Sequence, residues 1–220
     1  MRKIILVLVL VTPLFALSQF GIGIKGGLNF ANVTSTSSIN NSSRSGFVAG
    51  LFLAPKAKGI LSSRTELLFS RQGYNFKSNT NTGNVNLDYL LLPQLMSINI
   101  TKYFSIQLGA QMAILLNAKV DSSASGSSGT GPSPYGKLMD YYNKFDYGFA
   151  GGIEIHPVKG LLIGARYNIS FGNVYKDPSS YSTGTTPTPT SFIPDVNVKN
   201  NVFQIFAGWI FGGGQSKKKK

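Results

Sequence analysis

Apolar side chains recur at every second position along most of this chain, and this period limits the fold more than any other feature. In residues 104–115 apolar residues alternate with small or polar ones, and residues 20–31, 145–155 and 161–172 repeat the pattern. A period of two puts alternate side chains on opposite faces of a β-strand. We therefore expect strands with one apolar face and one small-polar face.

Eight strands are expected from this pattern. They span residues 20–31, 46–54, 61–75, 85–98, 104–115, 145–155, 161–172 and 202–211. No segment holds 18 consecutive apolar residues, so a helical membrane span is not expected after the N-terminal region.

The connections between these strands alternate in length. Short segments occupy residues 55–60, 99–103 and 156–160, and long segments rich in Ser, Thr, Asn, Gly and Pro occupy residues 32–45, 76–84, 116–144 and 175–201. Short turns at one rim and long loops at the other are typical of a membrane barrel, which must close because lipid cannot satisfy an open sheet edge. The predicted fold is all-β, an eight-stranded antiparallel up-and-down transmembrane β-barrel.

The chain is poor in charge: 13% of its residues are charged, against about 25% in a typical soluble domain. A soluble barrel of the lipocalin type is the alternative fold, but its outward face would be rich in Lys and Glu. Here the polar face holds glycines such as Gly23, Gly109 and Gly152, with Gln, Asn and Ser. Such small residues suit the crowded interior of an eight-stranded barrel. The apolar faces are therefore expected to face lipid.

Aromatic residues are expected to mark both rims of the barrel. Tyr103 and Trp209 fall beside short turns, and Phe47, Tyr74 and Tyr175 fall towards the long loops. Aromatic rings collect at headgroup depth because they combine an apolar body with a polar edge. This distribution favours the membrane barrel.

The N-terminus has the pattern of a secretory signal peptide. Arg2 and Lys3 precede an apolar run at residues 4–17, and small residues lead to Ser18. The run is shorter than the roughly 20 residues of a transmembrane helix, so we expect cleavage before Gln19, with an uncleaved anchor as the alternative. The expected organisation is a signal peptide at 1–18, an outer-membrane barrel at 19–211 and a basic tail at 212–220.

Three segments resemble one known family. Residues 20–30 (FGIGIKGGLNF), 66–73 (ELLFSRQG) and 89–93 (YLLLP) are similar to the PorT-like outer-membrane β-barrel proteins of the Bacteroidetes, whose architecture is that of OmpA- and OmpX-type barrels. The resemblance covers about residues 19–211. It implies a barrel without a defined activity, and the family's namesake belongs to a protein-secretion system. The family carries a proline at Pro93, where we expect a bulge.

No catalytic, metal or cofactor site is expected. Gly21, Gly23 and Gly26 spell G-x-G-x-x-G, but no strand precedes them and no helix follows, so they do not indicate dinucleotide binding. His156 is the one histidine and there is no cysteine, which argues against a metal centre. Ser170 has no histidine at its own rim, so catalysis is not expected. No basic cluster lies inside the fold, and no nucleic-acid partner is expected.

The charged residues on the polar faces are the one group that remains as a candidate functional site. They are Lys25, Arg64, Glu66, Asp88, Asp146, Glu154 and Arg166, all expected in the lumen or at its rims. Buried charges are tolerated only when they are paired and hydrogen-bonded. The first interpretation is a packed polar core that holds the barrel shut, and the second is an ion-conducting or proton-relay path.

The long loops are the expected place of function. Tyr135, Tyr141 and Tyr142 lie on an aromatic arm that could supply anchors for a partner, since binding usually resides in loops on a rigid scaffold. The other interpretation is that residues 135–142 extend the sixth strand as a ribbon above the membrane.

These observations predict a non-enzymatic outer-membrane protein with a filled polar lumen, surrounded by outer-membrane lipid. The leading hypothesis is an envelope structural or surface-interaction protein that meets a protein partner at its extracellular loops. The alternatives are an accessory component of a secretion complex and a porin-like channel for small solutes.

Overall fold

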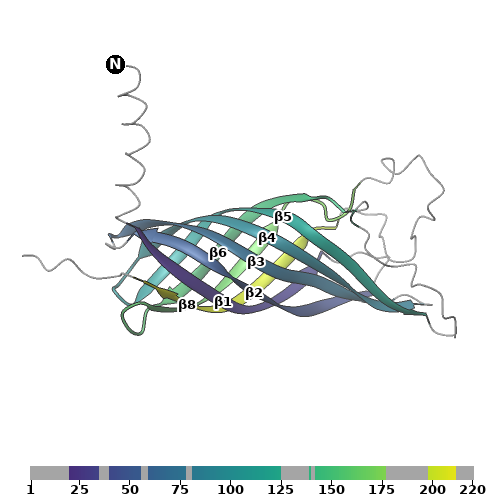
Figure 1. Ribbon diagram of the computed structural model, residues 1–220, viewed down its shortest axis with the longest axis horizontal. Helices are drawn as coiled ribbons and strands as arrows, with labels where there is room; N and C mark the ends of the chain where they lie inside the picture. Colours follow the sequence, from purple (N-terminus) through teal and green to yellow (C-terminus); the bar gives the residue numbers. More distant parts are fainter. Residues whose placement is uncertain are drawn as a thin grey trace, which may run out of the picture.

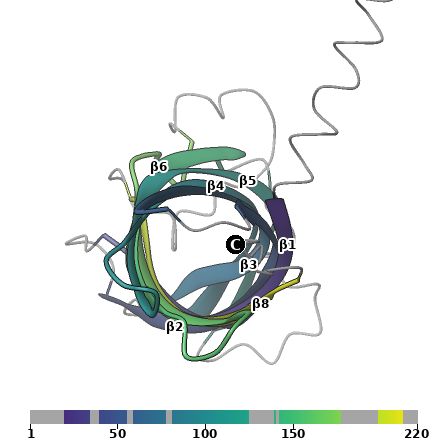
Figure 2. The same ribbon diagram turned by 90° about the vertical axis from the view of Figure 1, so that its left-hand side faces the viewer.

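The fold is a closed barrel of antiparallel strands. The computed structural model describes residues 20–34, 40–55, 59–77, 81–124, 139, 142–176 and 198–211. Its strands are β1 (Phe20–Val33), β2 (Asn40–Pro55), β3 (Leu61–Lys77), β4 (Asn81–Asn99), β5 (Phe104–Ala124), β6 (Phe145–Ile155), β7 (Leu161–Ser170) and β8 (Asn200–Ile210). Each strand pairs with its sequence neighbours, and β1 pairs with β8 to close the ring (Figures 1 and 2). The predicted eight-stranded antiparallel barrel is confirmed.

Predicted and observed strand ends differ most in β2 and β5. β2 begins at Asn40 and β5 continues to Ala124, where loops were expected. A bulge explains the difference in β5: Tyr89 pairs with Leu115 while Asp88 pairs with Asn117, so one residue of β5 is left over and the alternation shifts. The polar residues beyond that point therefore looked like loop.

Pro93 does not form the bulge that we expected. It pairs with Gln111 in regular register, and the β3–β4 pairs stop at Thr65↔Gln94 and resume at Leu68↔Leu91 in the same register. Because proline has no N–H donor, it interrupts the ladder on one side of β4 without displacing the strand.

The apolar faces point outward, as predicted. Exposed residues on this belt include Ile22, Leu51, Leu67, Leu108, Ile153 and Ile205. The interior is less uniformly polar than expected, because the inward face of β4 is apolar: Leu87, Leu91 and Leu95 are all buried. The inward face of β3 is mixed, with Leu68 between the polar residues Glu66 and Ser70. The prediction of one small-polar face per strand is wrong for β4.

Glycines on neighbouring strands make room for these large interior side chains. Gly50 pairs with Leu68, and Gly109 pairs with Leu95. A Cβ atom at Gly50 would lie 2.1 Å from the carbonyl oxygen of Leu67, so the backbones approach more closely than any other residue allows. Large and small residues thus alternate across the inner wall.

The strands differ in length, and this makes the long-loop end of the barrel, called its upper end below, asymmetric. β2 to β5 have 16, 17, 19 and 21 residues, whereas β6, β7 and β8 have 11, 10 and 11. A membrane-spanning strand needs about 9–11 residues. Figure 1 shows β3, β4 and β5 continuing to the right, past the end of the yellow strand β8. We call residues 40–45, 71–77, 81–88 and 116–124 the β2–β5 extension.

Candidate functional site in the barrel interior

Five charged side chains meet inside the barrel near the short turns. Lys25 comes from β1, Arg64 and Glu66 from β3, Glu154 from β6 and Arg166 from β7. None of them is more than 6% exposed. Each lies on the inward parity of its strand, because the residues beside it in sequence face outward. We call this group the interior charge cluster.

Glu66 is the centre of the cluster. Arg166 donates to both of its carboxylate oxygens, from Nη1 at 2.7 Å and from Nη2 at 2.9 Å, and Nη2 also donates to Gln107 Oε1 at 2.8 Å. Lys25 Nζ donates to Glu66 Oε2 at 3.1 Å. Two cations, one on β1 and one on β7, therefore share one buried carboxylate. The arginine binds it in the bidentate geometry that makes Arg–carboxylate pairs strong.

Glu154 forms the second half of the cluster with Arg64. Arg64 donates to it from both Nη atoms, with Nη2 at 3.0 Å from Oε2. Arg64 Nη1 also lies 3.8 Å from Glu66 Oε1, which joins the two halves. His156 Nε2 lies 3.8 Å from Glu154 Oε2 and 3.3 Å from Ser105 Oγ.

Two interior phenylalanines cover the cations. Lys25 Nζ lies 3.6 Å from the ring centroid of Phe206, and Arg166 Cζ lies 5.1 Å from the same centroid. Arg64 Cζ lies 4.8 Å from the ring centroid of Phe52. Such contacts stabilise cations most where water is excluded. The cluster is therefore packed as well as paired.

The structure brings together five of the seven charged residues that the sequence singled out. Asp88 lies elsewhere, because Leu87 and Tyr89 point inward and the residue between them faces out, where it pairs with Arg71. Asp146 lies at the loop end of β6 and accepts bonds from the amides of Tyr147 (2.8 Å) and Gly172 (3.2 Å).

Sequence reasoning missed three participants. Gln107 and His156 contact the interior charge cluster, and Arg71 is the partner of Asp88. Gln107 shares the polar parity of its strand, so alternation could have found it. Arg71 lies on the outward face of β3, opposite to Glu66. Because paired residues on neighbouring strands lie on the same face, this position could have shown that Asp88 also faces out.

An apolar cluster occupies the interior at the loop end. Its members include Tyr74, Phe76, Val85, Leu87 and Tyr89 from β3 and β4, with Tyr142, Val174, Tyr175 and Val198 from segments beyond the ends of β6, β7 and β8. We call it the upper apolar cluster. A bridge between Tyr142 and Tyr175 and a bond from Val174 N to Val198 O (2.8 Å) continue the wall there.

Tyrosine hydroxyls tie the upper apolar cluster together. The hydroxyls of Tyr74 and Tyr175 are hydrogen-bonded to each other, and the rings of Tyr142 and Tyr175 lie 4.9 Å apart. Burial raises the pKa of Tyr175 well above its ordinary value, so this residue stays neutral. Tyr74 and Tyr175, expected on the aromatic rim, are interior residues instead.

Of the three tyrosines predicted as loop contacts, the structure describes one. Tyr142 is 0% exposed, so the expectation that it is an accessible anchor is corrected: its ring packs inward against Tyr175. Tyr135 and Tyr141 lie outside the described residues, as do the predicted signal peptide and the basic tail.

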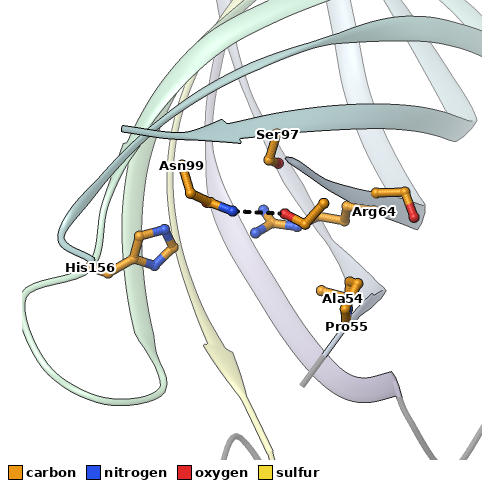
Figure 3. A pocket seen from close by; sticks show the side chains of 8 residues that line it. Ala54, Pro55, Arg64, Ser97, Asn99 and His156 are labelled. Atoms are coloured by element: carbon orange, nitrogen blue, oxygen red, sulfur yellow. Dashed lines mark hydrogen bonds between the residues drawn. The ribbon is translucent and has the colours of Figure 1, made fainter. Parts of the chain in front are cut away.

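At the short-turn end the interior charge cluster meets a small cavity. It has a volume of about 10 Å³ and is lined by Ala54, Pro55, Ser62, Ser63, Arg64, Ser97, Asn99 and His156. Asn99 and Arg64 point towards one another there, and Asn99 Nδ2 donates to Ser62 Oγ at 3.1 Å (Figure 3). A cavity of this size holds about one water molecule.

The described part of the chain offers no other familiar kind of centre. No helix within it is long and apolar enough to cross a membrane. Its His, Asp and Glu side chains form no group of three or more that could hold a metal ion.

A closed antiparallel barrel with an outward apolar belt, short turns at one rim and charges paired inside defines the class of membrane-spanning β-barrels. The family can also be stated. Residues 13–176 match the family model described as outer membrane protein beta-barrel domain, and the chain belongs to that family. It is a protein of the bacterial outer membrane.

Several solved barrels are similar to this chain at low sequence identity. Neisserial surface protein A is 16% identical, with 86% of this chain and 97% of that chain covered and a TM-score of 0.50. Ail of Yersinia pestis is 15% identical, with 88% and 99% covered and a TM-score of 0.46. OprG of Pseudomonas aeruginosa is 11% identical, with 87% and 95% covered and a TM-score of 0.41. No curated protein gives a significant match.

Proposed function

We propose that this protein is a non-enzymatic envelope protein whose barrel is closed to solutes and which acts in outer-membrane structure or in interactions at the cell surface. The observation that carries the proposal is the occupation of the interior at both ends. The interior charge cluster fills the short-turn end, and the upper apolar cluster fills the loop end. A solute would have to break ion pairs at one end and displace packed rings at the other.

The burial of the charges supports this closed state. Side chains that line a water-filled pore remain accessible to solvent, whereas Glu66 and Glu154 are 0% exposed. Charges withdrawn from water need direct partners, and each carboxylate has at least one Arg within 3.0 Å. The arrangement fits a structural core better than an ion path.

Planar bilayer recording tests the closed state. Purified wild-type protein should give no steady unitary conductance, while a wide porin recorded in the same bilayers should. Steady open channels from the wild-type protein would overturn the proposal in favour of the small-solute channel.

The β2–β5 extension is the surface that we assign to interactions. Its support is the strand length beyond what membrane spanning needs. A photo-crosslinking residue in place of exposed Lys77, at the loop end of β3, should capture a partner on whole cells. The same residue in place of exposed Lys102, in the short turn between β4 and β5, should not. Capture from Lys102 alone would instead favour the accessory role in protein secretion that the PorT-like resemblance implies.

Export by a cleaved signal peptide is part of the same proposal. The support is the charged start, apolar run and small residues of positions 1–18. Protein from outer-membrane fractions should have Gln19 as its first residue by N-terminal sequencing. A chain that still begins at Met1 would favour the uncleaved anchor.

A further inference from the structure

A hydrogen-bonded polar pair lies on the outer wall of β3 and β4, within the apolar belt. Thr65 and Gln94 are cross-strand partners, and both are exposed. Thr65 Oγ1 donates to Gln94 Oε1 at 2.6 Å. From the short turn up to the Arg71–Asp88 pair, the outward residues of β4 are Ile98, Met96, Gln94, Leu92 and Leu90. Gln94 is therefore the middle residue of this outward row.

The depth of Gln94 places its amide in the hydrocarbon of the membrane. Two residues of strand advance by about 6.6 Å, and a strand tilt of about 40° reduces this to about 5 Å of height per outward residue. Gln94 thus lies about 10 Å from either end of its row, near the middle of an apolar band about 25 Å tall. Because there is no water at this depth, the polar atoms of Gln94 need partners within the membrane.

Thr65 satisfies only part of the Gln94 amide. A glutamine side chain carries two N–H donors and an oxygen that can accept two hydrogen bonds. The Thr65 hydroxyl occupies one acceptor position, and Gln94 Nε2 has no hydrogen-bond partner among the residues that the structure describes. An unpaired amide N–H is unfavourable in an apolar medium, and the acyl chains of lipids offer no acceptor. This point of the wall therefore calls for a partner that both donates and accepts.

The surface around Gln94 suits close contact with another membrane-spanning protein. Its neighbour on β5 is Ala110, which also faces outward and presents only a methyl group. The exposed apolar side chains of Leu67, Leu92 and Met96 lie around it. Lipid gives no hydrophobic driving force for association, so contacts within a membrane rely on small residues that allow close approach and on polar groups that hydrogen-bond across. Gln94 and Ala110 together supply both.

A second copy of this chain carries the matching group at the matching depth. Two copies inserted in the same direction are related by a twofold axis along the membrane normal, so each residue on the axis meets its own equivalent. Across such an axis, Nε2 of each Gln94 can donate to Oε1 of the other. This arrangement uses a free donor and the remaining acceptor position of both amides. A different protein would need its own polar group at this depth, whereas the second copy has one by symmetry.

We propose that this protein forms a twofold-symmetric dimer in the outer membrane through the outward face of β3, β4 and β5. The two Gln94 side chains are hydrogen-bonded to each other at the centre of the contact. Thr65 is a positioning residue that holds each amide by its oxygen, and Ala110 allows the two walls to approach. The contact lies within the belt, so it does not depend on a partner at the loops.

Fluorescence energy transfer between copies tests the dimer. The chain has no native cysteine, so Lys102→Cys in an exposed short turn provides one labelling site in the full mature protein. Donor- and acceptor-labelled copies are mixed in phosphatidylcholine vesicles over a range of lipid dilutions. Transfer should persist at dilutions where chance proximity is negligible. Gln94→Leu should raise the dissociation constant about tenfold, the size expected for two hydrogen bonds across a contact in lipid.

The matched control removes a polar group from the belt elsewhere. Tyr167→Phe deletes an exposed hydroxyl on β7 and should leave the dissociation constant unchanged. Equal effects of Gln94→Leu and Tyr167→Phe would overturn the role of the amide. A wild-type chain that is monomeric at every dilution would overturn the dimer. A chain that is monomeric in vesicles but held in a complex in native outer membranes would assign the surface to a different protein, against the proposal.

A second pair of variants locates the contact. Ala110→Trp places a large ring beside Gln94 and should weaken the dimer, because the two walls could no longer approach. Ala207→Trp makes the same change on the outward face of β8, across the ring from β4, and should not (Figure 2). Dissociation caused by Ala207→Trp alone would place the contact on the wrong side of the barrel. If Ala110→Trp does not give the heat-shifted band of a folded barrel, Ala110→Leu against Ala207→Leu provides the comparison.

Discussion

Glu66 accepts hydrogen bonds from both Lys25 and Arg166. Among the described side chains, no other interior carboxylate accepts hydrogen bonds from two cations. A buried pair adds little net stability relative to an apolar packing, but loss of one member leaves the other charge uncompensated. The stability of the barrel therefore depends more on Glu66 being present than on the strength of its bonds.

Glu66→Ala should lower the free energy of unfolding by about 3–5 kcal/mol, because Lys25 and Arg166 would remain buried without their shared partner. Urea unfolding in lipid vesicles, followed by the heat-shifted gel band, measures the change. Lys159→Ala in an exposed turn is the control and should have little effect. Equal shifts for both variants would show that Glu66 is not in a dry interior.

Gly50→Ala should destabilise the barrel by about 1–3 kcal/mol, the usual cost of forcing an atom into a packed site. The added Cβ would lie 2.1 Å from Leu67 O and 2.8 Å from Leu68 Cα, both backbone atoms that cannot move aside cheaply. Gly26→Ala is the matched control, since its Cβ would meet nothing closer than 3.9 Å. The same unfolding assay compares them, and the idea fails if Gly26→Ala is the more harmful change.

The barrel wall at the loop end is built in two ways. β2 to β5 continue the wall as regular sheet, whereas residues 142–143, 173–175 and 198–199 continue it above the short strands through single bridges and bonds. These segments have few regular hydrogen bonds, so the packing of their apolar side chains must hold them. Tyr142 is central to that packing.

Tyr142→Ala should loosen the upper wall, because a fully buried ring would be replaced by a cavity at a cost of about 3–5 kcal/mol. Hydrogen exchange should accelerate at the amides of Asn143 and Val174 and stay slow in the lower half of β7. Tyr147→Ala, on the outward face of β6, should leave these amides protected. Unchanged exchange in the Tyr142 variant would return this residue to the list of accessible loop contacts.

At the scale of the whole molecule, the eight strands close the ring by their own pairing, so the connection between β5 and β6 should not be needed for closure. Ring closure runs through β1–β8 pairing, and both interior clusters are built from the strands and the segments next to them. Loop length itself has a small energetic cost, since closure entropy grows only logarithmically. Folding and closure should therefore be separable from whatever the loop binds.

Deletion of residues 125–133 should leave the heat-shifted band intact and the bilayers free of steady conductance. The reason is that β5 ends at Ala124 and none of the ion pairs in the interior charge cluster involves the deleted segment. Gel mobility and planar bilayer recording check both halves of the expectation. Open channels in the deletion variant would assign closure to that loop.

Most of the fold could be predicted from the alternation of apolar and polar residues along single strands. It depends only on the parity of each residue, and parity is a local property that survives into the barrel, so the outward belt, the strand number and the position of Glu66 in the interior followed from the sequence. It failed where parity is interrupted, at the bulge beside Asp88, and where the inward face is apolar too, in β4.

Partner choice in the interior was decided by the tertiary structure alone. Lys25 and Arg166 reach Glu66 from positions 41 and 100 residues away, and which carboxylate faces which cation depends on how the ring closes and how far its strands are tilted. The burial of Tyr142 and Tyr175 likewise came from the folding of aperiodic segments onto the rim. For most residues of the regular strands the sequence by itself determined which side chains face inward, because the period of two is a local property of each strand. Only closure of the barrel decided which of these side chains meet, because the distances between them depend on several strands at once.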